Sequence, residues 1–215
     1  MTSADIARAR LTKKRTRIQE ENEERILDAG LEVFSAYGFR GATIDQIAER
    51  AGMTKPNLLY YFRRKDDVYL AVLQRTVEAW MQPLEALGAG DDPAVEIKAY
   101  LARKLEMARE NPTASRLYAM EMMQGAPMLG AVLSNWMKEL VDEKAALLRR
   151  WSAEGRMAPV DPYHLIFMIW ATTQHYADYE VQVRAMLGPA TDGNRHFAGA
   201  SETLDAVFLG GLFRR

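Results

Sequence analysis

The fold is decided by residues 43–65, TIDQIAERAGMTKPNLLYYFRRK. Thr43 followed by Gln46 three residues later is typical of a capping box, in which side chains and backbone N–H groups at a helix start satisfy one another. Gly52 predicts a tight turn, and Thr54 predicts the cap of a second short helix. Two short helices joined by a glycine turn indicate a helix-turn-helix, whose second helix presents its N-terminal residues to the major groove of DNA.

Polar side chains in and around this motif are candidate DNA contacts. Hydroxyl and amino groups bind phosphate oxygens, and the N-terminal end of a helix favours anions. Asn57, in the first turn of the second helix, can donate to and accept from one base edge, as Asn does with adenine. The predicted DNA-binding residues are Thr43, Thr54, Lys55, Asn57, Tyr60, Tyr61, Lys65 and Arg40. Apolar residues at helical spacing predict the small core instead, namely Ile44, Ile47, Leu58 and Phe62.

A further helix is predicted from Asn22, with Gly38 as its C-terminal stop. Before it, residues 1–20 form a locally basic segment, which we expect to be a flexible arm. Such an arm either reaches the DNA backbone and minor groove or is a solvated tail, and the sequence leaves both interpretations open.

The rest of the chain also shows helical periodicity, broken by Gly and Pro residues. The predicted segments are roughly 65–87, 93–109, 113–123, 128–153, 162–187 and 202–209. We therefore expect an all-α fold, with a small helix-turn-helix domain at residues 21–67 followed by a larger helical domain at 68–215.

Composition excludes several kinds of chemistry. The chain of 215 residues has a formal net charge of -1 and no cysteine, which rules out disulfides, thiolate metal sites and cysteine nucleophiles. The absence of cysteine suits a reducing cytoplasm, and the apolar run at residues 165–170 is too short to span a membrane. We expect a cytoplasmic protein that needs no membrane.

Histidine gives little support for a metal site or for catalysis. His164 and His175 lie eleven residues apart on one predicted helix, about three turns, which is too far to bind a single metal ion. His175 and Asp178 have the spacing of a helical contact, and this pair alone favours the alternative of a hydrolase or metal enzyme. We expect no enzyme activity, no metal and no cofactor.

The stretch at residues 43–65 resembles the signature of the TetR family, from the capped helix through the aromatic end of the reader helix. The resemblance covers about the first 70 residues. It departs from many relatives at Leu59, where they carry an aromatic residue. The resemblance implies a homodimer on near-palindromic, double-stranded operator DNA, with reader helices about 34–36 Å apart or a larger whole-turn spacing.

The larger domain resembles one subgroup of that family. Residues 115–127, SRLYAMEMMQGAP, and 161–179, DPYHLIFMIWATTQHYADY, are similar to the regulatory domain of the pyrimidine-utilisation regulators, and the likeness extends to Trp80, Pro83 and Leu84. The resemblance implies a repressor of pyrimidine catabolism that uracil or thymine releases from its operator. It also makes residues 68–215 an effector-binding and dimerisation domain.

The residues themselves suggest how a base would bind. The amide of Gln174 can donate and accept simultaneously toward an imide, and Trp80 and Trp170 can stack on a flat ring. With Thr173 and His175 they form the predicted ligand-binding set. The same aromatic residues could instead fill a helical core. Two functional alternatives stay open: a repressor of an efflux or other catabolic operon with a different aromatic or lipophilic effector, and an architectural DNA-binding dimer without effector.

Overall fold

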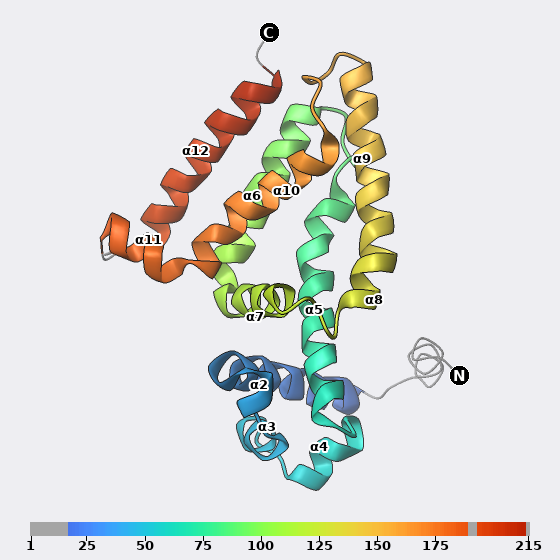
Figure 1. Ribbon diagram of the computed structural model, residues 1–215, viewed down its shortest axis with the longest axis vertical. Helices are drawn as coiled ribbons and strands as arrows, with labels where there is room; N and C mark the ends of the chain where they lie inside the picture. The colour runs from blue at the N-terminus through green and yellow to red at the C-terminus, as the bar shows by residue number, and fades with distance from the viewer. Residues whose placement is uncertain (1–16, 189–192, 214–215) are drawn as a thin grey trace. The chain divides into compact units, whose positions relative to one another are not determined.

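The computed structural model describes residues 17–188 and 193–213, and every regular element within those ranges is a helix (Figure 1). The chain divides into two compact units, Met1–Val72 and Leu73–Arg215. The expected all-α class is therefore confirmed. None of the helices in the described ranges is long and apolar enough to cross a membrane.

The first unit contains α2 (Arg17–Gly41), α3 (Ile44–Arg50), α4 (Lys55–Tyr61) and the first turns of α5 (Lys65–Ala86). Its core includes Ile47 and Leu58, which are completely buried, and Phe62, which is 3% exposed. These three core predictions are confirmed, whereas Ile44 is only half-buried. The basic arm lies almost wholly outside the described residues.

The predicted glycine stop at the end of α2 is visible as a break. Gly38 has a φ of 67° and a ψ of 171°, a non-helical conformation that side-chain-bearing residues rarely adopt. A further helical turn continues to Gly41, and the helix is already formed at Arg17, earlier than the predicted Asn22. The following helices begin as the sequence predicts, because Thr43 forms a complete capping box with Gln46.

The second unit contains the rest of α5 and seven further α-helices within the described ranges. They are α6 (Pro93–Glu110), α7 (Pro112–Met123), α8 (Gly130–Val132), α9 (Lys138–Ala153), α10 (Pro162–Asp178), α11 (Glu180–Leu187) and α12 (Gly193–Phe213). A π-helical turn, η1 (Leu133–Met137), joins α8 to α9. Helix α6 packs against α7, α10 and α12, and α10 also packs against α9.

Three predicted helix ranges were wrong in detail. The segment 128–153 is interrupted by η1, and the segment 162–187 breaks at Tyr179, whose φ of -115° and ψ of 31° are not helical. The last helix extends well beyond 202–209, because Ala200, Leu204, Phe208 and Leu212 are all buried. Packing of that apolar stripe overrides the low helix propensity of the nearby glycines.

Candidate functional site

The turn between α3 and α4 is held by a contact from α2. Gly52 has a φ of 65°, and the Nη2 atom of Arg25 donates to the carbonyl oxygen of Ala51 at 2.6 Å. A Cβ atom on residue 52 would lie 3.1 Å from the same guanidinium nitrogen. The glycine therefore provides both the left-handed backbone and the space for Arg25, which fixes the angle between the two short helices.

The start of α4 presents its side chains to solvent. Thr54 caps the helix by accepting from the backbone N–H of Asn57 at 3.4 Å, and this cap leaves the Asn57 side chain exposed. Tyr60 is 71% exposed one turn further along. Arg40 and Thr43 are also exposed. The predicted base-reading side chain thus lies at the N-terminal end of a short, capped and solvent-facing helix.

Three predicted phosphate contacts already have partners within the protein. Lys55 pairs with Asp45 at 2.9 Å, and both side chains are exposed. The Nζ of Lys65 donates to the carbonyl oxygens of Phe39 at 2.6 Å and Ala42 at 2.8 Å, so Lys65 caps the end of α2. The hydroxyl of Tyr61 accepts from Asn22 at 2.9 Å. Their DNA roles, like those of the other members of the set, stay predictions.

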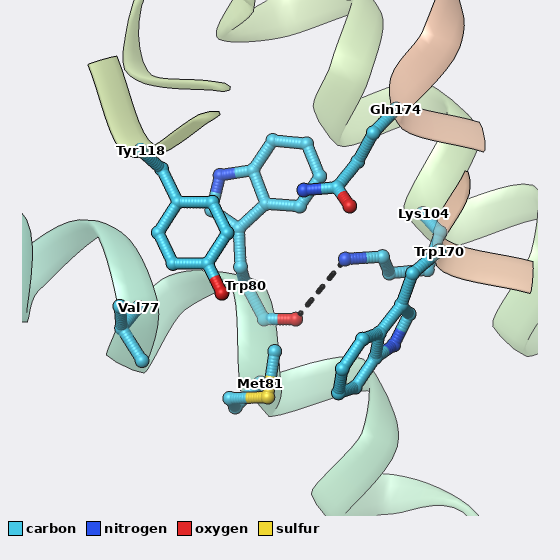
Figure 2. A pocket seen from close by; sticks show the side chains of 7 residues that line it. All are labelled: Val77, Trp80, Met81, Lys104, Tyr118, Trp170 and Gln174. Carbon is cyan, nitrogen blue, oxygen red and sulfur yellow. Dashed lines mark hydrogen bonds between the residues drawn. The ribbon is translucent and has the colours of Figure 1, made fainter. Parts of the chain in front are cut away.

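A small cavity lies in the second unit, where α5, α6, α7 and α10 meet (Figure 2). It is lined by Val77, Trp80, Met81, Lys104, Tyr118, Trp170 and Gln174. The space open to the centre of a water molecule is about 10 Å³, which is room for about one water. The cavity is therefore nearly closed in this structure.

Two indole rings and an amide meet in this cavity. Trp80 is 5% exposed, and Trp170 is fixed by a hydrogen bond from its Nε1 to the hydroxyl oxygen of Tyr100 at 2.7 Å. Gln174 lies one turn after Trp170 on α10 and is half-buried. Three of the five predicted ligand-binding residues, Trp80, Trp170 and Gln174, are thus brought together.

The other two predicted ligand-binding residues do not line this cavity. Thr173 is completely buried, and its hydroxyl donates to the carbonyl oxygen of Ile169 on its own helix at 2.8 Å. His175 is exposed and its ring stacks on Tyr179 at a centroid distance of 5.0 Å. Neighbouring positions on a helix point in directions about 100° apart, so Gln174 faces the cavity while its neighbours do not.

The pair that favoured an enzyme has other partners. Asp178 accepts the hydroxyl of Ser115 at 2.5 Å, and burial, the largest influence, raises the pKa of Asp178. Among the described residues, no group of three or more His, Cys, Asp or Glu side chains could hold a metal ion.

Sequence reasoning missed Lys104, the charged residue in the cavity wall. Its side chain is 1% exposed, and its Nζ lies 4.0 Å from the centroid of the Trp80 ring and 3.5 Å from the Trp80 carbonyl oxygen. Burial lowers the pKa of Lys104 to about 7, while the carboxylate of Asp178 acts in the opposite direction. The signal was present, because Lys104 falls in line with Tyr100, Leu101 and Ala108 on the buried face of α6.

Tyr118 was missed as well. It comes from α7, lines the cavity and is half-buried, and burial raises the pKa of its hydroxyl. The tyrosine lies in the stretch 115–127 whose resemblance was recognised, but no pattern in that stretch distinguishes it from a core residue.

Two family models together match most of the chain. Residues 26–72 match the model described as bacterial regulatory proteins, tetR family, and residues 73–215 match the model described as YcdC-like protein, C-terminal region. The chain belongs to the TetR family. Both models of the TetR family meet at the boundary that separates the two structural units.

Individual proteins with similar sequences are HTH-type transcriptional regulators. The HTH-type transcriptional regulator RutR of Escherichia coli K12 is 45% identical over 201 residues, which cover 94% of this chain and 95% of RutR. RutR of Shigella flexneri shows the same identity and coverage. The HTH-type transcriptional regulator SrpR of Pseudomonas putida is 46% identical, but over 66 residues, 31% of this chain and 29% of SrpR.

Solved structures share the TetR fold. The Streptomyces coelicolor protein SCO4942 superposes with a TM-score of 0.71 at 23% identity, covering 89% of this chain and 98% of that one. A TetR-like transcriptional regulator from Rhodococcus sp. RHA1 gives a TM-score of 0.64 at 23% identity, covering 92% and 98% of the two chains. The family and its relatives identify the protein as a DNA-binding transcriptional regulator of the TetR family and not as an enzyme.

Proposed function

We propose that this regulator is a homodimeric repressor of pyrimidine catabolism, whose operator affinity falls when uracil or thymine fills the cavity of the second unit. One observation carries the proposal: two indole rings, a primary amide and an ammonium group converge on a single buried site. The identity of 45% to RutR over nearly the whole chain, together with the resemblance of residues 161–179 to pyrimidine-utilisation regulators, supports the same effector class.

The chemistry of the cavity wall suits an uncharged diketo pyrimidine. The amide of Gln174 can donate to a ring carbonyl and accept from the adjacent imide N–H at the same time. Trp80 and Trp170 offer flat apolar surface for the ring, and Trp170 is held in place by Tyr100. Affinity then comes from the aromatic surfaces and orientation from the polar groups.

The base cannot enter without some movement, because the cavity has room for only about one water molecule. Two features lower the free energy needed for that movement. Lys104 is held to the Trp80 carbonyl by a hydrogen bond of 3.5 Å, the long end of the range. Pro83, inside α5, removes one backbone hydrogen bond within a turn of Trp80.

Helix α5 offers a route from effector to DNA. Its C-terminal half carries Val77, Trp80 and Met81 in the cavity wall, and its first turns belong to the helix-turn-helix unit. An effector that repositions these side chains therefore acts on a helix that the DNA-reading unit shares. A coupling of about 1–3 kcal/mol changes operator affinity roughly 5- to 150-fold.

In this proposal, the dimer interface is formed by α10 and α12. Phe167 and Met168 on α10 are 49% and 54% exposed, and Val207 on α12 is 60% exposed. Gly199 and Gly211 of α12 have no atom within 4 Å of where a Cβ would lie, so a helix from a second copy can approach closely. Apolar helix faces of this kind are buried by pairing α10 and α12 with their copies in an intersubunit bundle.

The test is isothermal titration of the protein with uracil, repeated with Gln174→Ala. We expect saturable heat in the wild type and its loss in the variant, while Gln182→Ala, an exposed glutamine on α11, binds as the wild type does. Absence of heat with uracil and thymine, but binding of an unrelated aromatic compound, would replace the pyrimidine with another effector. If none of these ligands raises the melting temperature of the protein, a dimer without effector is favoured.

A further inference from the structure

We infer that Lys104 reads a carbonyl oxygen of the effector, and that effector binding draws a proton onto the Lys104 amine. This inference rests on the proposed function of the cavity and specifies how that site chooses its ligand. It makes operator release sensitive to pH as well as to the effector.

The first step is the geometry of the amine. An ammonium group has three N–H donors. Within the described ranges the structure gives Lys104 one oxygen acceptor, the Trp80 carbonyl at 3.5 Å, and one aromatic face, the Trp80 ring at 4.0 Å. Figure 2 shows the polar ends of Lys104 and Gln174 both directed toward Trp80. The Lys104 side chain therefore has donor capacity that a ligand in this cavity can use.

The second step is the charge of the amine before the ligand arrives. Burial lowers the pKa of Lys104 to about 7, so near neutral pH a sizeable share of the ligand-free molecules carries a neutral amine. Filling the cavity costs the amine little further hydration, because its side chain is already 1% exposed. A carbonyl oxygen within reach supplies a charge-assisted hydrogen bond that only the protonated form can donate fully. The ligand thus favours the protonated form and raises the pKa.

The neighbouring ionisable groups do not provide this effect. On α7, Tyr118 has a pKa raised by burial and stays neutral near pH 7. On α10, Asp178 accepts the hydroxyl of Ser115, its pKa is raised by burial, and its carboxylate already opposes the lowering of the Lys104 pKa. On α6 itself, Tyr100 accepts from Trp170 and its pKa is raised by burial. The cavity residues of α5 have no ionisable side chain.

The same donor gives the site its selectivity. Uracil and thymine present two carbonyl oxygens on either side of an imide N–H, so Gln174 and Lys104 can each engage one edge of the imide. With Lys104 at the 4-oxygen, cytosine, which carries an amino group at that position, would set donor against donor. A buried site that is built to donate rejects such an analogue, because its own polar groups are left without partners.

The experiment is titration of the full-length protein with uracil, in buffers of different ionisation enthalpy, at about pH 6 and about pH 8. The dependence of the measured heat on the buffer gives the number of protons taken up. We expect close to none at pH 6, where Lys104 is already charged, and close to one at pH 8. The Kd for uracil rises up to about tenfold per pH unit above 7.

Two variants assign the proton. Lys104→Met keeps the length of the side chain and should bind uracil more weakly, without proton uptake and with a Kd that no longer follows pH. His175→Gln, which removes the exposed imidazole stacked on Tyr179 outside the cavity, should keep the uptake. Thermal unfolding of each variant without ligand confirms that it is folded.

The outcomes separate this inference from the proposed function. Uracil binding with no proton uptake, with proton release, or with the same affinity in Lys104→Met overturns the role of Lys104 and leaves the pyrimidine effector in place. No binding of uracil or thymine by the wild type overturns both. Cytosine binding as tight as uracil overturns the selectivity argument.

Discussion

The two units hold their polar side chains in opposite surroundings. In the first, the residues at the start of α4 are exposed, and Thr54 caps the helix by accepting from the backbone N–H of Asn57, three positions further on. In the second, Lys104 and Gln174 come from different helices and lie in the wall of one cavity. A DNA-reading surface needs side chains that water already solvates, whereas a sensor of small uncharged molecules needs polar groups that lack water and gain from the ligand.

The largest effect on stability and operator binding is expected when a side chain is removed from the core of the first unit. Phe34 has no exposed surface and contacts Phe39 and Tyr69, with ring centroids 6.2 Å and 4.9 Å away. Phe34→Ala is expected to cost about 3–5 kcal/mol of folding free energy and to abolish operator binding. Urea unfolding and a gel-shift assay measure both.

The matched control is Tyr37→Ala, on the same helix but 59% exposed, which should change stability by less than about 0.5 kcal/mol. Effector binding to Phe34→Ala should persist if the two units differ as described. Loss of uracil binding in that variant would show that the cavity depends on the core of the first unit.

The next largest effect concerns what the exposed helix reads. Asn57→Ala should reduce discrimination between operator and altered sequences by about 1–3 kcal/mol, because the side chain and not the cap is lost. Fluorescence anisotropy with an operator series measures the change, and Asn135→Ala, an exposed asparagine of the second unit, serves as control. A uniform loss of affinity for every sequence would assign Asn57 to phosphate contact.

The burial of Lys104 in the second unit is tested by measuring how the free energy of unfolding depends on pH. The pKa of Lys104 is about 7 in the folded protein and near 10.5, its ordinary value, when unfolded, so the unfolded chain holds more protons between these limits. The free energy of unfolding should therefore rise with pH over that window, by up to about 1.4 kcal/mol per pH unit from this group. Urea unfolding of wild type and Lys104→Met near pH 7.5 and 9 measures the difference, and parallel pH dependence would contradict it.

Sequence reasoning succeeded where the determining interactions are local. The capping box of Thr43 and the turn at Gly52 follow from residues within a few positions, and Ile47 and Leu58 follow from helical periodicity. The break at Tyr179 was missed, because the apolar pattern of α10 continues into α11 without a Gly or Pro.

The cavity was only partly accessible from sequence, because its wall comes from helices far apart in the chain. Trp80, Trp170 and Gln174 were found through resemblance and side-chain chemistry. Lys104 was not, although it lies on the apolar face of α6, since a lysine is rarely buried and most lysines on such a face extend to solvent. Thr173 was included for a hydroxyl that could bond to the ligand, but that hydroxyl donates to the backbone of its own helix.

The smallest expected effect distinguishes two lysines of the first unit. Lys55 forms an exposed ion pair with Asp45, so Lys55→Ala should change stability by less than about 0.5 kcal/mol. If Lys55 also binds phosphate, the variant weakens all DNA sequences alike and lowers the salt dependence of binding by about one phosphate contact. Lys65→Ala should instead cost stability, on the order of 1–2 kcal/mol, because Lys65 caps two carbonyl oxygens at the end of α2. Anisotropy titrations over a range of salt concentrations, paired with urea unfolding, separate the two roles. An unchanged salt dependence of DNA binding in Lys55→Ala would show that Lys55 only pairs with Asp45 and does not bind phosphate. A reduced salt dependence in Lys65→Ala, without loss of stability, would make Lys65 the phosphate contact.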